Sequence, residues 1–175
     1  MDFSLQKQEK KFLALFLSSF AALYLLVQAL PIDSLLEKLT ALEVALLNFA
    51  GVAASSTQTT IFTPSIEFEI VRDCSGLVMA SLLAALLFAS KPNQKISWKN
   101  NSNYWQGALK TLLLFAPLLL AFNVLRLWVT LFAGAHYGQS TLDAVHFTLW
   151  IVDSAVVLLV WMHSQKLSFA KKVSA

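Results

Sequence analysis

The segment TLLLFAPLLLAFNVLRLWVTLFA, residues 111–133, contains one charged side chain, Arg126. About 20 apolar residues in a helix are enough to cross the hydrocarbon core of a bilayer. Pro117 predicts a kink in this helix, because proline removes one of its hydrogen bonds. The segment therefore predicts a membrane-spanning helix that carries an arginine.

The composition of the whole chain indicates the same environment. Of the 175 residues, 57% are hydrophobic and 13% are charged, whereas a soluble domain has about 25% charged residues. So little charge cannot cover the surface of a small water-soluble protein, so a cytosolic enzyme and a disordered chain are both excluded. The one cysteine excludes an intrachain disulfide and a cysteine-rich zinc site.

Three other segments are also apolar. We expect spans near residues 12–30, 74–90, 111–133 and 144–162, of which 74–90 is short but is bounded by charged residues on both sides. The expected fold is an all-α integral membrane protein, a single polytopic membrane domain over residues 1–175. No repeat or separate domain interrupts it.

The lysines predict how the chain is oriented. Ten of the 13 Lys and Arg residues precede the first span, lie between the second and third, or follow the fourth: Lys7, Lys10, Lys11, Lys91, Lys95, Lys99, Lys110, Lys166, Lys171 and Lys172. By the positive-inside rule, both termini and the 91–110 loop face the cytoplasm. The positive net charge thus has a topological origin, and no nucleic-acid partner is expected.

Residues 35–54 form an ambiguous segment. An apolar stripe at helical spacing is interrupted by Glu37, Lys38 and Glu43; its members are Leu35, Leu39, Leu42, Leu46 and Phe49. This pattern favours a helix lying in the outer interface. The alternative is a further span, which would force the 91–110 loop to the outside. Residues 57–73 then predict a short outer hairpin that turns at Pro64-Ser65.

The first 30 residues have an alternative interpretation as a cleaved signal peptide. Lys7–Lys11 would be its basic region and Val27-Gln28-Ala29 its cleavage site. The apolar run is long for a signal peptide, and Pro31 lies just after the cut. We therefore expect a retained span.

The predicted topology places three reactive side chains at similar depth near the outer face, namely Cys74, Arg126 and His146. Separately, each has an ordinary explanation. Cys74 could be a small apolar residue, Arg126 an anchor that snorkels to the outer interface, and His146 an interfacial anchor. An arginine inside a span nevertheless costs about 2.5–3.5 kcal/mol and usually marks a functional site. Together the three residues therefore predict an active site.

These residue types suit acyl transfer. A helix N-terminus and Arg126 would favour the Cys74 thiolate, and a neutral His146 could accept a proton. Arg126 could stabilise an oxyanion, and Asn123 shares its helical face. Asp73 is expected to cap the second span or to balance Arg126, although its charge opposes activation of the thiol.

Three blocks of the sequence resemble the signature blocks of the exosortase/archaeosortase family. They are Asp73-Cys74-Ser75-Gly76-Leu77, Asn123-Val124-Leu125-Arg126-Leu127 and Val145-His146-Phe147, in this order, and the resemblance covers residues 35–163. It implies that Cys74, Arg126 and His146 are catalytic. We expect four further residues to support them: Asp73, Ser75, Asn123 and Asp153.

The resemblance also implies an activity. Family members are regarded as membrane cysteine transpeptidases that process secreted proteins with a C-terminal motif, a transmembrane helix and a basic tail. The expected partners are such substrates, membrane lipid and an amine or lipid-linked acceptor; no cofactor or metal is implied. The active site would face the outside of the cell membrane.

Asp153 does not match the family pattern. It could pair with Arg126, orient His146, or contact a polar group on a neighbouring helix. An alternative function follows from the same charges: a non-enzymatic membrane subunit or scaffold that uses Arg126 and Asp153 for assembly. A transporter is disfavoured because four spans without an inverted repeat do not fit that architecture.

Overall fold

The computed structural model describes the backbone of residues 3–90 and 98–173 and the side chains of residues 9–90 and 105–164. Five α-helices, one 3-10 turn and three short strands make up this part of the chain. In order they are α1 Phe3–Ala29, α2 Asp33–Phe49, β1 Ser55–Thr57, β2 Thr60–Phe62, β3 Glu67–Glu69, η1 Arg72–Ser75, α3 Leu77–Ala89, α4 Trp98–Tyr137 and α5 Gln139–Val173.

Three of the described helices are long and apolar enough to cross a membrane, within Glu9–Ala29, Trp105–Tyr137 and Gln139–Ser164. Few of the side chains in these segments are buried inside the protein. So large an apolar surface requires lipid around it. The predicted all-α integral membrane protein is therefore confirmed.

The predicted span at 74–90 is wrong in length. Its helix, α3, has 13 residues and begins at Leu77, which gives a length of about 20 Å at 1.5 Å per residue. Gly76 stops the helix from extending backwards, since its φ of 77° lies in the left-handed region. Cys74 consequently belongs to the 3-10 turn η1 and not to α3.

The segment between the second and third predicted spans is also more helical than expected. We predicted a loop at 91–110, but α4 already begins at Trp98 and continues for 40 residues, with Pro117 inside it. Residues 91–97 lie outside the described residues. So do the side chains of five other predicted cytoplasmic lysines: Lys7, Lys99, Lys166, Lys171 and Lys172.

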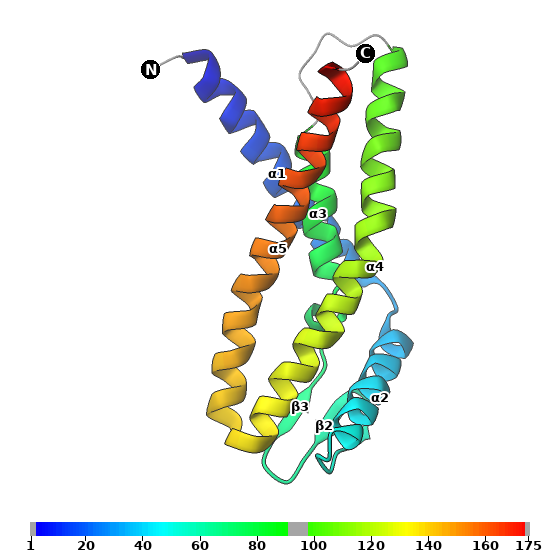
Figure 1. Cartoon of the computed structure of the whole chain (residues 1–175), viewed down its shortest axis with the longest axis vertical. Helices are drawn as coiled ribbons and strands as arrows, with labels where there is room; N and C mark the ends of the chain where they lie inside the picture. The colour runs from blue at the N-terminus through cyan, green and yellow to red at the C-terminus, as the bar shows by residue number, and fades with distance from the viewer. Residues whose placement is uncertain (1–2, 91–97, 174–175) are drawn as a thin grey trace.

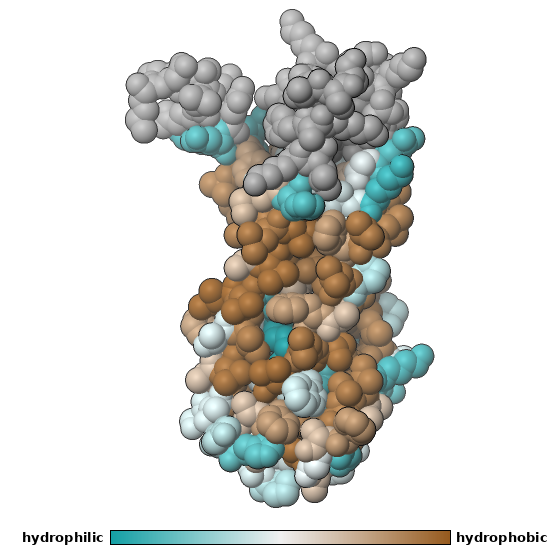
Figure 2. Space-filling model, viewed as in Figure 1, coloured by the Kyte–Doolittle hydropathy of each residue, from teal (hydrophilic) through white to brown (hydrophobic). Residues whose placement is uncertain are grey.

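Figure 1 shows how the helices are arranged. The beginning of α1, the beginning of α4 and the end of α5 lie at one end of the bundle, while α2 and the strands lie at the other. Apolar side chains cover the middle of the visible face in Figure 2, and hydrophilic ones lie toward both ends. The beginnings of α1 and α4 and the end of α5, each of which carries lysines in the sequence, thus lie opposite the sheet.

The predicted hairpin is part of a three-stranded antiparallel sheet in the order β1-β2-β3. The β2–β3 pair turns around Pro64-Ser65 as expected, with Phe62 opposite Glu67. We predicted one extended stretch before this turn, but Gln58 adopts a φ of 54° and reverses the chain there. The reversal creates β1, which pairs with β2.

The face of helix α2 that packs against the rest of the protein is not the predicted apolar stripe. Its buried residues are Leu36, Thr40, Glu43 and Leu47, and α2 packs beside α4. The stripe members Leu35, Leu42 and Phe49 are exposed. An outward apolar stripe on a helix at the sheet end fits the interfacial position that the sequence favoured.

Candidate active site

The predicted nucleophile lies in a tight turn between the sheet and α3. The backbone N–H of Cys74 donates to the carbonyl of Val71 at 2.8 Å. Ser75 is buried, and its Oγ accepts from the N–H of Leu77 at 3.2 Å. These two bonds fix the turn on both sides of Cys74, so Ser75 has a structural partner in the turn.

Gly76 lets this turn approach α4 very closely. A Cβ atom at this position would meet Leu120 Cδ2 at 3.0 Å and Asn123 Cβ at 3.1 Å. Both the space and the positive φ therefore require glycine. The Cys-Ser-Gly sequence is thus explained by geometry as well as by its cysteine.

Asn123 connects α4 to the turn. Its Nδ2 donates to the carbonyl oxygen of Cys74 at 2.7 Å, and only 1% of the residue is exposed. The helix that carries Arg126 is therefore bonded directly to the backbone of the cysteine. The shared helical face that the sequence predicted for Asn123 and Arg126 is turned toward Cys74.

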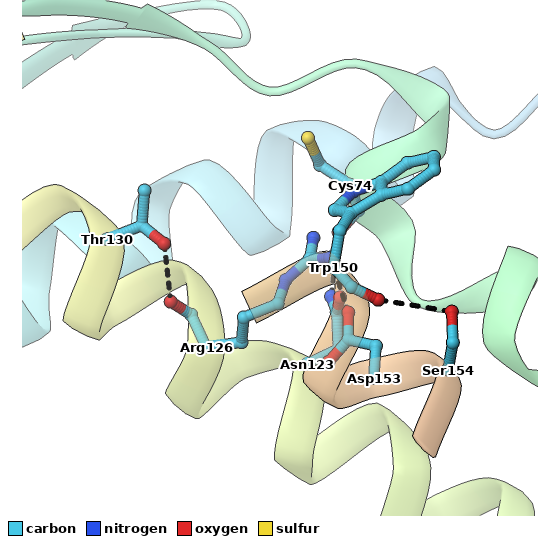
Figure 3. Close-up of polar contacts among 7 residues, drawn as sticks. All are labelled: Cys74, Asn123, Arg126, Thr130, Trp150, Asp153 and Ser154. Carbon is cyan, nitrogen blue, oxygen red and sulfur yellow. Dashed lines mark hydrogen bonds and ion pairs between the residues drawn. The ribbon is translucent and has the colours of Figure 1, made fainter. Parts of the chain in front are cut away.

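Arg126 and Asp153 form a buried ion pair between α4 and α5. Arg126 Nη1 donates to Asp153 Oδ2 at 2.5 Å, and Figure 3 shows the two side chains meeting between the helices, beside Cys74. Of the three roles considered for Asp153, the structure shows the pairing with Arg126. The Nε and Nη2 atoms of Arg126 are buried without a partner.

His146 lies in the second turn of α5. Its ring packs edge-on against Phe68, with 5.7 Å between the ring centroids, and Phe68 packs against the cluster of buried side chains that contains Cys74. Its Nδ1 is buried and has no partner. No hydrogen bond between His146 and Cys74 is found among the described residues, so the two are brought near one cluster but are not hydrogen-bonded to each other.

Asp73 does not have either of its predicted partners. Its carboxylate accepts from Gln28 Nε2 at 2.7 Å and from Tyr24 Oη at 3.3 Å. Both donors lie on α1, so Asp73 neither caps α3 nor balances Arg126. The expectation failed because the two donors are more than 40 residues away in the sequence and no local pattern indicates them.

The environment of Cys74 corrects the expected thiolate. Burial raises the pKa of the Cys74 thiol, while a backbone hydrogen bond at Val71 and the charge of Arg126 act in the opposite direction, and Asp73 raises it slightly. Cys74 lies in η1 and not at the first residue of α3, where the sequence analysis expected it. The free thiol is therefore protonated at neutral pH and needs a base.

Glu43 is a buried carboxyl that the sequence analysis treated only as an interruption. It is fully buried on α2, and neither carboxyl oxygen has a partner. Burial raises the pKa of Glu43 from 4.5 to about 8. Residues 36, 40, 43 and 47 are spaced as one face of a helix, and this spacing was the available signal for the burial of Glu43. The face is less apolar than the exposed stripe, so it was not predicted to be the buried one.

A cavity of about 330 Å³ opens beside the turn. Polar side chains from α1, α2, β3 and η1 line it, including Gln28, Asp33, Glu69, Arg72 and Asp73. An ion pair of 3.4 Å joins Arg72 to Asp33. Cys74 itself is 3% exposed and does not line this cavity. The cavity thus lies next to the turn that carries the cysteine.

Among the described residues, no group of three or more His, Cys, Asp or Glu side chains could hold a metal ion.

No curated protein and no solved structure matches the chain significantly. The family model described as Transmembrane exosortase (Exosortase_EpsH) matches residues 10–163, which is most of the sequence and includes all three signature blocks. The chain therefore belongs to the transmembrane exosortase family.

Proposed function

We propose that this protein is a membrane-embedded cysteine transpeptidase that cleaves C-terminal sorting signals of secreted proteins. Family membership supports the general activity. The observation that carries the assignment of residues is the bond from Asn123 to the Cys74 carbonyl, because it fixes the cysteine against the helix that carries Arg126. Arg126 still has two buried donors without a partner.

The first half of the reaction forms a thioester. Cys74 Sγ attacks the carbonyl carbon of the scissile peptide bond while His146 accepts the thiol proton. Arg126 stabilises the oxyanion of the tetrahedral intermediate. The C–N bond then breaks, and the leaving amine takes the proton from His146.

The second half releases the product. An amine acceptor, or water, attacks the thioester carbonyl, and His146 accepts its proton. The C–S bond breaks, and the proton returns to the sulfur of Cys74. Transfer to an amine anchors the substrate, whereas water hydrolyses it, and the same three side chains serve both outcomes.

A groove between α4 and α5 suits the transmembrane helix of the substrate. It has a volume of about 380 Å³ and an almost entirely apolar lining that includes Phe122, Leu125 and Val156. Phe122 directly precedes Asn123 and Leu125 directly precedes Arg126, while Val156 lies one turn after Asp153. A helix in this groove would therefore bring the residues that precede it to the site.

We place the site at the outer face of the cell membrane, with both termini in the cytoplasm. The lysine pattern supports this orientation, and so does the position of the site between the sheet end and the middle of the bundle. The alternative, a scaffold with assembly charges, is less well supported because Arg126 and Asp153 pair with each other inside one chain.

The test uses a tagged secreted protein from the same organism that ends in a shared motif, an apolar helix and a basic tail. Cys74→Ala, Cys74→Ser and His146→Ala should each leave the uncut precursor in the membrane, and Ser154→Ala, on the exposed side of α5, should process it normally. The double variant Cys74→Ala/His146→Ala should be scarcely worse than either single variant. Normal processing by Cys74→Ala would show that the cysteine only packs.

A further inference from the structure

The guanidinium group of Arg126 is bound on one side only. Nη1 is held by Asp153, while Nε and Nη2 are buried without a partner. The N–H groups of Nε and Nη2 point along the same edge of the planar group, so together they can hold one or two oxygen atoms. Leaving such donors unpaired in the interior is costly, so natural proteins rarely do it without a functional reason.

Two acceptors lie in the same cluster. Asn123 Oδ1 and Asp153 Oδ1 are also buried without a partner, and both residues are at most 5% exposed. Free donors and free acceptors side by side match a peptide unit, which offers one C=O and one N–H. A phosphate or carboxylate ligand would use only the donors.

The position of Asp153 is fixed by packing. Val157, one turn further along α5, is fully buried in a cluster with Leu119 of α4. Leu119 lies one turn before Asn123. The Asp153 carboxylate thus approaches Arg126 from a helix that is packed against α4. It accepts a hydrogen bond from Nη1 of Arg126 only.

We propose that Asp153 is a positioning residue, which holds Nη1 of Arg126 so that the Nε–Nη2 edge is kept for a carbonyl oxygen of the substrate main chain. Asn123 Oδ1 and Asp153 Oδ1 accept a main-chain N–H of the same substrate. This role rests on the proposed transpeptidase function. It differs from a purely structural ion pair, which requires only that the two charges meet.

The decisive variant is Asp153→Glu. Glutamate keeps the charge and can keep the ion pair, but its extra methylene shifts the oxygen that fixes the guanidinium group. We expect the unfolding temperature in detergent to change by a few degrees at most. With the tagged precursor as substrate, kcat per folded enzyme should fall about 10–100-fold, with a smaller change in KM, because the bond to the oxyanion is strongest in the transition state.

Three further variants complete the experiment. Asp153→Asn tests the charge and should also lower kcat, and Ser154→Ala, the neighbouring residue on α5, should behave like the wild type. Cys74→Ala reports on the proposed function. If Cys74→Ala is inactive while Asp153→Glu turns over at the wild-type rate, Asp153 is a structural partner only and the inference is wrong. If Cys74→Ala is active, the transpeptidase assignment itself fails.

Discussion

The side-chain amide of Asn123 donates to the backbone carbonyl of Cys74, 2.7 Å away, and so joins two segments that are 49 residues apart. The bond leaves the sulfur free, because it uses the main chain of the cysteine. In Figure 3 the side chains of Asn123, Arg126 and Asp153 gather beneath the turn that carries Cys74. Placement of the nucleophile therefore depends on α4 as much as on its own turn.

Asn123→Ala should lower processing while the protein still accumulates. Without the amide, the buried Cys74 carbonyl loses its donor, which costs about 1–3 kcal/mol of stability, and the turn loses its fixed distance to α4. The measurement is the ratio of precursor to mature substrate, corrected for enzyme level. Thr130→Val is the matched control, since Thr130 is equally buried on α4 but bonds only to a carbonyl of its own helix. Equal processing by the two variants would contradict the role of Asn123.

Arg126→Lys should lose most of its processing activity. An ammonium group can still meet Asp153, but it lacks the planar fork whose second edge is free. The protein should still insert and accumulate, because a positive charge remains for the buried carboxylate. The readout is the same immunoblot beside a membrane-fraction blot of the enzyme. Near-normal activity of this variant would show that Arg126 serves only as an interfacial anchor.

The stability of the protein should fall as the pH rises from about 4.5 to about 8, owing to Glu43. Below 4.5 its carboxyl is protonated in both states; between the two values the unfolded chain ionises, but the buried group does not. Each pH unit in this window removes up to about 1.4 kcal/mol.

Thermal unfolding in detergent at pH 5, 6.5 and 8 tests this dependence. Glu43→Gln should flatten the pH dependence and be more stable than the wild type at pH 8. Glu37→Gln, on the exposed side of the same helix, should leave the curve unchanged. A parallel pH response in wild type and Glu43→Gln would refute the assignment to Glu43.

The orientation can be tested with single cysteines in a Cys74→Ala background. A membrane-impermeant thiol reagent applied to intact cells should label Ser65→Cys, in the exposed turn between β2 and β3. Gln94→Cys, between α3 and α4, should react only after the cells are permeabilised. The reverse pattern would place the site on the cytoplasmic side and overturn the predicted topology.

The spans could be predicted because they depend on local composition, which one segment carries by itself. The length of α3 could not be predicted from composition. The uncharged stretch continues back to Cys74, but the left-handed conformation of Gly76 makes the helix begin only after this glycine. The buried face of α2 was missed for another reason. Its exposed stripe is the more apolar one, which is the pattern expected of a helix that lies in a membrane interface.

In the candidate site, too, local features could be predicted from the sequence and features that depend on distant contacts could not. Cys74, Arg126 and Asn123 were indicated by unusual residue types in an apolar setting, and the structure brings them together. The partners of Asp73 on α1 and the burial of Glu43 depend on packing between distant segments. Whether His146 serves as the base stays a prediction, since the structure places it near the cluster without a bond to the sulfur.

The close fit of Gly76 against Leu120 and Asn123 has a mechanical consequence. The turn packs directly against α4 and is hydrogen-bonded to it through Asn123, so a tilt of α4 would carry the cysteine along with the arginine. The sulfur and the guanidinium group would therefore move as one body.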